Sequence, residues 1–206
     1  TDADVAPTVL ARAFRPAVDA SFNAVTIDSD QSTSDTAVVM ASGASGAKVK
    51  RGTPAARKFA GALGEVCTAL AMAMARDGEG ATRLIEVNVH RAASSADARA
   101  AARSVADSPL VKTAVHGADP NWGRVVMAVG KSAANVAPGK LAVRIGGIRV
   151  FSRGRPAKFD EAEVAARLEA DPVTIEIDLG LGKAKYTAWT CDLSREYIAI
   201  NADYHT

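Results

Sequence analysis

Apolar residues recur along the chain with two different periods, one typical of helices and one typical of strands. Near the beginning they are spaced by four, which predicts a helix with one buried face that opens at Pro7. The positions in question are Leu10, Phe14, Val18 and Phe22. A longer helix is predicted from Thr53-Pro54 to about Arg76, because threonine caps helices well and proline is favoured at the first helical position.

Strands are predicted where the period changes to two. Residues 173–179 alternate between apolar and polar, and residues 183–190 are expected to pair with them as the second strand of a hairpin. Gly146-Gly147 predicts another hairpin. The apolar run Ala37 to Ala41 is bounded by turn residues and predicts a strand buried on both faces. Further strands are expected at 25–27 and 83–89, and further helices at 94–107, 122–129 and 160–169.

These elements predict an α+β fold with helices packed on sheets. The last third of the chain differs in character, because hairpins dominate it. We therefore expect two domains, a sheet-and-helix core over 1–138 and a hairpin-rich domain over 139–206 that ends in a short tail.

Composition narrows the class of protein. The 206 residues are 48% hydrophobic and 23% charged, which is ordinary for a soluble domain. The net charge is +2, the basic residues are scattered and aromatics reach only 5%, so nucleic-acid binding is not expected. The apolar stretch 59–75 contains two glycines and Glu65, which favours a packed helix over a membrane span. No signal peptide is recognised, and a cytoplasmic location is expected.

Several potential sites fail on spacing. Cys67 and Cys191 are far apart and lie in apolar surroundings, which predicts two buried thiols rather than a disulfide or a metal site. The three histidines share no spacing suited to zinc. Gly180-Leu181-Gly182-Lys183 lacks the remaining glycine and hydroxyl positions of a phosphate loop and is interpreted as a turn.

Two segments carry candidate chemistry. In Asp77-Gly78-Glu79-Gly80 a carboxylate lies between two glycines at a helix end, where backbone can approach a ligand closely. The same pattern also fits a glycine cap beside a solvated acid. Asp119-Pro120-Asn121-Trp122-Gly123-Arg124 is a dense polar turn with an aromatic residue, and its composition predicts special backbone angles without assigning a function.

The segment from Leu110 to Arg124, which contains this turn, resembles the signature block of the ornithine acetyltransferase family. Four other stretches resemble the family in the same order along the chain. They are Thr1-Asp2-Ala3, Ser32-Thr33-Ser34-Asp35-Thr36, Asp77 to Arg83, and Tyr197 to Tyr204. The resemblance therefore covers the whole chain and is highly specific.

The resemblance implies a bifunctional ornithine acetyltransferase and N-acetylglutamate synthase of arginine biosynthesis, with the layered fold of that self-processing family. The precursor would cleave itself between Ala and Thr into α and β chains that stay together. An (αβ)2 heterotetramer is expected. The freed threonine would take the acetyl group from N-acetylornithine and pass it to glutamate, with its own amine as the base. The α chain would supply the oxyanion hole. Neither a metal nor an organic cofactor is implied, and acetyl-CoA is a further donor in some members.

The resemblance also assigns site residues. Glu79 matches the family's substrate-contacting glutamate, and Asn201 and Thr206 match two tail positions that hold the substrate. Thr1 does not match the nucleophile, because the family's cleavage site lies several residues before the Thr-Asp-Ala stretch. The nucleophilic threonine is therefore expected upstream of Thr1, and no catalytic residue is expected in this chain.

Two other functions stay open. A related N-terminal-nucleophile aminopeptidase would release its product to water instead of to a second amine. A paralogue without the nucleophile would bind amino acids without catalysis.

Overall fold

The computed structural model describes residues 1–204, and Thr206 lies outside the described residues. The chain forms two compact units. Unit 1 comprises residues 1–24 and 30–73, and unit 2 comprises residues 25–29 and the chain from Met74 onward.

Unit 1 is built on two long helices and a short parallel strand pair. Its elements are β1 (Asp4–Val5), α1 (Pro7–Asp19), the 3-10 helix η1 (Phe22–Ala24), β2 (Lys48–Val49) and most of α2 (Pro54–Arg76). A small apolar core gathers Ala3, Val5 and Val49 with Leu10 and Phe59. The helix predicted from apolar spacing and the helix predicted from its Thr-Pro cap are both confirmed.

The buried strand predicted at Ala37 to Ala41 is wrong. No strand forms there, and Val38 and Met40 are 69% and 76% exposed. A short apolar run carries no information about which strand would pair with it, and in this chain none does.

Helix α2 presents exposed apolar side chains. Val66 and Leu70, four residues apart, are both 55% exposed. The helix is long and apolar enough to cross a membrane by length and composition, and 17% of its most apolar window is buried. Length and hydropathy alone do not separate a membrane span from a helix that packs against protein.

Unit 2 contains a six-stranded mixed sheet in the order β6-β5-β4-β7-β3-β8. The strands are β3 (Leu84–Ala92), β4 (Ala142–Ile145), β5 (Ile148–Ser152), β6 (Arg155–Pro156), β7 (Val173–Asp178) and β8 (Ala184–Cys191). The predicted hairpin of residues 140–152 is confirmed as β4 and β5. The predicted pairing of β7 with β8 is wrong, because β3 lies between them, parallel to β7 and antiparallel to β8.

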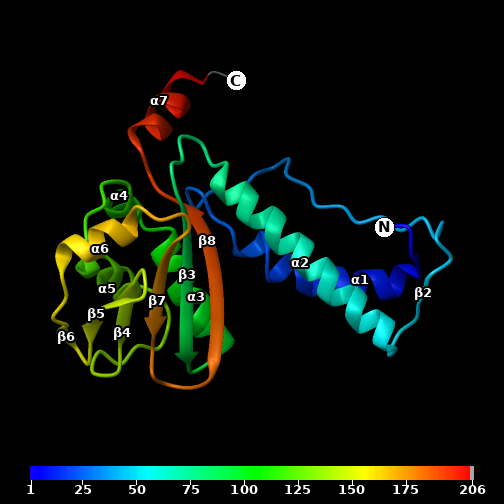
Figure 1. Cartoon of the computed structure of the whole chain (residues 1–206), viewed down its shortest axis with the longest axis horizontal. Helices are drawn as coiled ribbons and strands as arrows, with labels where there is room; N and C mark the ends of the chain where they lie inside the picture. The colour runs from blue at the N-terminus through cyan, green and yellow to red at the C-terminus, as the bar shows by residue number, and fades with distance from the viewer. Residues whose placement is uncertain (205–206) are drawn as a thin grey trace. The chain divides into compact units, whose positions relative to one another are not determined.

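Helices cover one face of this sheet. They are α3 (Ser95–Ala106), α4 (Pro109–His116), α5 (Trp122–Gly130) and α6 (Glu161–Leu168), and α7 (Arg195–Asp203) follows the last strand. Helix α3 packs against β3 and β8 (Figure 1). Val87 and Ile175 are buried on the covered face, whereas Glu86 and Asn88 alternate with such residues and form hydrogen bonds to side chains of β8. The α+β class is confirmed.

The domain boundary expected between residues 138 and 139 falls inside this sheet. Strand β3 precedes the boundary, and β4 to β8 follow it. The compact units follow a different division, because long-range strand pairing joins segments that differ in local character.

The turn from β7 to β8 gives the first prediction. A methyl group on Gly182 would lie 2.4 Å from the carbonyl oxygen of Ala92, which is held in the sheet. We expect Gly182→Ala to lower the free energy of unfolding by about 2 to 3 kcal/mol through overpacking. Gly139→Ala is the control, because its methyl group would have no atom within 4 Å. Urea unfolding measures both, and equal effects would contradict the proposed clash.

Candidate functional site

Glu79 projects from a tightly fitted turn between α2 and β3. The turn has a glycine on each side of this exposed carboxylate. A Cβ on Gly78 would lie 2.8 Å from Sγ of Cys191. Gly80 has a φ of +65°, and a Cβ there would lie 2.5 Å from the backbone nitrogen of Tyr197. Glycine is therefore required on both sides of Glu79, by the core on one side and by α7 on the other.

Helix α7 begins directly against this turn. Ser194 caps the helix, because its hydroxyl oxygen accepts hydrogen bonds from the backbone N–H groups of Glu196 and Tyr197. The same hydroxyl donates to the carbonyl oxygen of Gly80 at 2.6 Å. One side chain thus starts the helix and ties it to the Glu79 turn. The segment expected to be a short tail is helical from Arg195 to Asp203.

This arrangement brings two of the three predicted site residues together. The amide Nδ2 of Asn201 donates to Oε2 of Glu79 at 2.5 Å and also to the carbonyl oxygen of Tyr197. Both Glu79 and Asn201 are exposed. The third predicted residue, Thr206, lies outside the described residues. A carboxylate and an amide side by side can bind an ammonium group and hydrogen-bond its neighbours.

The buried carboxylate of Asp192 binds the residues that follow the Glu79 turn. The side chain of Asp192 has no exposed surface and accepts hydrogen bonds from the backbone and hydroxyl of Thr82 and the backbone of Arg83. Nδ1 of His116 lies 2.7 Å from Oδ2 of Asp192. Burial alone would raise the pKa of Asp192, but the hydrogen bonds from Thr82, His116 and Arg83 together lower it below its usual value.

The buried ammonium group of Lys112 lies beside Cys191, the residue before Asp192. Nζ of Lys112 donates to the carbonyl oxygen of Ile27 at 2.5 Å and to the hydroxyl of Thr190 at 2.8 Å, and lies 3.7 Å from Sγ of Cys191. Burial lowers the pKa of Lys112 and raises the pKa of Cys191. Lys112 therefore fixes the segment at Ile27 against the end of β8.

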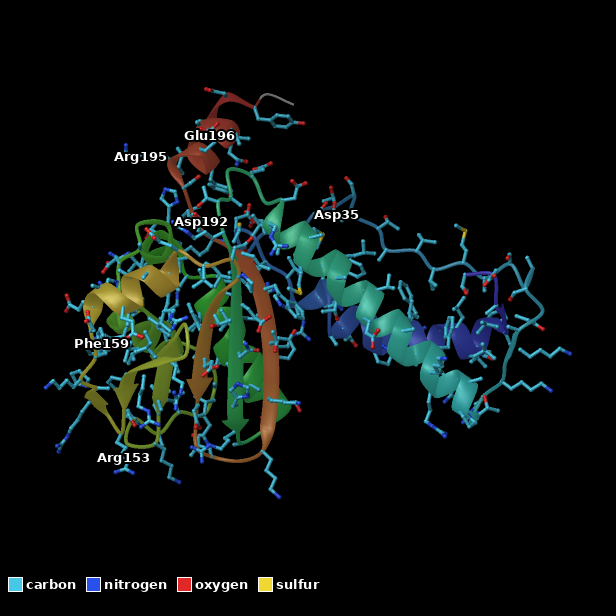
Figure 2. The ribbon with its side chains drawn as sticks, in the orientation of Figure 1. Asp35, Arg153, Phe159, Asp192, Arg195 and Glu196 are labelled. Carbon is cyan, nitrogen blue, oxygen red and sulfur yellow. The ribbon has the colours of Figure 1, made fainter. Side chains whose placement is uncertain are left out.

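A further hydrogen bond joins α7 to Asp28, the residue after Ile27. The hydroxyl of Tyr197 donates to Oδ2 of Asp28 at 2.8 Å. Helix α7 is thus held at its beginning by Ser194 and along its side by Asp28. Figure 2 shows Glu196 on this helix above the labelled Asp192.

Comparison with known proteins identifies the family to which this arrangement belongs. The model of the ArgJ family matches residues 1–206. The chain belongs to the ArgJ family. The arginine biosynthesis bifunctional protein ArgJ of Nitrobacter winogradskyi is 48% identical over 212 residues, and that of Deinococcus radiodurans is 49% identical over 206 residues. Both alignments include 100% of this chain and 51% of the relative, so the chain spans about half the length of these relatives.

A solved structure shows that the fold is also that of ArgJ. The arginine biosynthesis bifunctional protein ArgJ from Bacillus halodurans matches with a TM-score of 0.95 and 42% identity. The match covers 98% of this chain and 96% of that chain. The resemblance noted from short sequence stretches is thereby confirmed over the whole chain.

The polar turn from Asp119 to Arg124 joins neighbouring elements of the fold. Arg124 donates from its guanidinium group to the carbonyl oxygen of Leu110 and to the hydroxyl of Thr113. Trp122 stacks on Phe151, with ring centroids 5.2 Å apart. These contacts join α4, α5 and β5 and give the stretch an architectural role.

Sequence reasoning assigned no role to Asp192 or Ser194 in this ArgJ chain. Ser194 precedes Glu196 and an apolar segment, which is a usable signal for a helix start. Asp192 carries no comparable signal, because its partners Thr82 and His116 are 110 and 76 residues away in the sequence. Only the fold brings these groups together.

The buried Asp192 predicts a specific pH dependence of stability. A carboxyl group whose pKa is lower in the folded state stabilises that state above about pH 4, and the contribution is lost as the pH falls through the folded pKa. We expect Asp192→Asn to lower the free energy of unfolding at pH 7 by about 2 kcal/mol or more, because one acceptor becomes a donor facing donors. The loss should shrink as the pH falls from 4 to 2.

Urea unfolding between pH 2 and pH 7 measures this effect. Glu169→Gln is the matched control, because Glu169 is exposed at the end of α6. The free energy of unfolding of the control should fall with decreasing pH in the same way as that of the unmodified protein. If the free energy of unfolding of Asp192→Asn changed with pH in parallel with that of the unmodified protein, Asp192 would contribute nothing through its ionised form.

Proposed function

We propose that this chain is the β chain of a bifunctional enzyme that transfers the acetyl group of N-acetylornithine to glutamate. Ornithine and N-acetylglutamate would be the products, in arginine biosynthesis. The nucleophile would be the threonine expected upstream of Thr1, and a threonyl acyl-enzyme would carry the acetyl group between the two amino acids. Acetyl-CoA is a possible second donor for glutamate.

The observation that carries this proposal is the contact between Glu79 and Asn201. The ArgJ resemblance assigns substrate contacts to both residues, although 122 positions separate them in the sequence. Their side chains meet at an exposed surface, where a ligand can reach them. The printed names of the relatives, arginine biosynthesis bifunctional protein ArgJ, agree with the proposed pathway.

The chemistry of the two residues suits an amino-acid substrate. The carboxylate of Glu79 would pair with an ammonium group of the bound amino acid. The amide of Asn201 can donate to a carboxylate of the substrate while its oxygen accepts from an amine. Thr206 is proposed as the third substrate contact, on the resemblance alone.

We propose a companion chain to complete this site. The chain spans about half the length of its relatives, and Glu79 and Asn201 are open to solvent in the chain itself. The companion would be the α chain of the same precursor and would supply the oxyanion hole, in an (αβ)2 heterotetramer. A cytoplasmic location is proposed, which suits the two free buried thiols.

The proposed reaction is tested with the two-chain protein expressed from the whole gene. Incubation with N-acetylornithine and glutamate should give equal amounts of ornithine and N-acetylglutamate, with parallel lines in double-reciprocal plots as expected for ping-pong transfer. Release of free acetate in place of N-acetylglutamate would favour the aminopeptidase-like alternative. Binding of the amino acids without turnover would favour the paralogue that lacks a nucleophile.

Glu79 is predicted to act in substrate binding. Glu79→Gln should raise the KM for the amino-acid substrates by about tenfold or more, because a charged hydrogen bond contributes about 1.5 to 3 kcal/mol. The melting temperature should change little, since Glu79 is exposed. Asp203→Asn, which removes an exposed charge from α7, should leave KM unchanged.

A double-mutant cycle of Glu79→Gln with Asn201→Ala tests whether the two side chains bind the same substrate molecule. If Glu79 and Asn201 hold one substrate together, the combined effect on KM should be smaller than the sum of the single effects. A loss of stability that parallels the loss of activity in Glu79→Gln would instead support the helix-cap interpretation.

A further inference from the structure

The end of the sheet remote from Glu79 carries an unassigned basic cavity. It has a volume of about 720 Å³ and opens to solvent. Eight residues line it, of which five are cationic and one is acidic. They are Arg91, Lys140, Ala142, Arg149, Ser152, Arg153, Arg155 and Asp178.

This cavity is separate from the candidate site. Glu79 precedes the amino end of β3, whereas Arg91 lies at its carboxyl end. Strand β3 has nine residues and spans about 30 Å. Figure 2 shows Asp192, near the candidate site, and Arg153, at the cavity, at opposite ends of the sheet.

The positive charge of the cavity is not neutralised by the surrounding protein. Asp178 is its only acidic lining residue and already accepts two hydrogen bonds from Arg91, both at 2.7 Å. Within residues 1–204 the other four cationic side chains form no hydrogen bond or ion pair. These are Lys140, Arg149, Arg153 and Arg155. Like charges that converge on one hollow repel each other unless an anion lies between them.

Two of the arginines have a backbone conformation that is unusual for their residue type. Arg91 has a φ of +49° and Arg153 a φ of +55°, a conformation that side chains other than glycine adopt rarely. The carbonyl oxygen of Arg91 accepts from the backbone of Leu181 and Gly182, and the backbone N–H of Arg153 donates to Leu141. The positive φ of Arg153 belongs to the two-residue turn between β5 and β6, whereas that of Arg91 lies within β3 and is of the kind that clusters at ligand sites.

We propose that this basic cavity binds a small molecule with a chain of phosphate groups. Guanidinium groups match the geometry of phosphate oxygens and form paired hydrogen bonds with them. Four such groups around one hollow suit several phosphates of a single ligand. No aromatic residue lines the cavity, which disfavours a single-stranded nucleic acid, because such ligands stack their bases on aromatic rings.

Titration calorimetry on the two-chain protein at 0.15 M salt tests the proposal with inorganic tripolyphosphate. Binding should persist at this salt concentration, where interactions between separate surface charges are largely screened. The double variant Arg153→Asn, Arg155→Gln should weaken binding at least tenfold. Asparagine is chosen at position 153 because it tolerates a positive φ. If this double variant does not fold, Lys140→Gln replaces it.

The matched control removes two exposed positive charges elsewhere. Arg57→Gln with Lys58→Gln, on α2, should change the affinity by less than about twofold. ATP is the second ligand. Equal affinities for ATP and tripolyphosphate would assign recognition to the phosphate chain alone, and tighter ATP binding would assign a contribution to the nucleoside.

Three results would overturn the proposal. They are no binding of tripolyphosphate at 0.15 M salt, equal weakening in the cavity and control variants, or binding of a single-stranded oligonucleotide in its place. The readout is direct binding and does not require acetyl transfer. Failure of the proposed function would therefore leave this test unaffected.

Discussion

The candidate site depends on two points where the backbone comes too close to its neighbours for any side chain. At Gly78 the space that a Cβ needs is taken by Cys191, and at Gly80 it is taken by the first turn of α7. Glu79 lies between these points and is the only residue of the three whose side chain can project outward. The backbone therefore fixes where the side chain of Glu79 leaves the turn, and the amide of Asn201 hydrogen-bonds to its carboxylate.

The end of β8 holds the remaining parts of the site in place. Cys191, Asp192 and Ser194 lie within four positions and contact, in turn, the turn at Gly78, the start of β3 and the start of α7. A shift of this segment would move the two elements that carry Glu79 and Asn201. The antiparallel pairing of β8 with β3 links this segment to the centre of the sheet, where shifts are costly because the interior is closely packed.

Local patterns in the sequence predicted elements better than their arrangement. The helix that opens at Pro7 follows from apolar spacing, and the helix at 54–76 follows from its cap, because both signals are local. The strand order does not follow, since β3 enters between β7 and β8 through parallel pairing that no turn residue announces. The candidate site divides in the same way. Residue chemistry left Glu79 open between a cap and a ligand contact, and only the family resemblance joined it to Asn201.

The two ends of β3 differ in charge. At its amino end the fold exposes the carboxylate of Glu79, and at its carboxyl end it gathers five cationic side chains around one carboxylate. The net charge of only +2 hides this separation, because charges that cancel over the sequence lie far apart in space. At physiological salt, fields decay over about 8 Å, and β3 is several times longer. Under the two proposals, ammonium groups bind at the amino end and anions at the carboxyl end, and neither site requires the other.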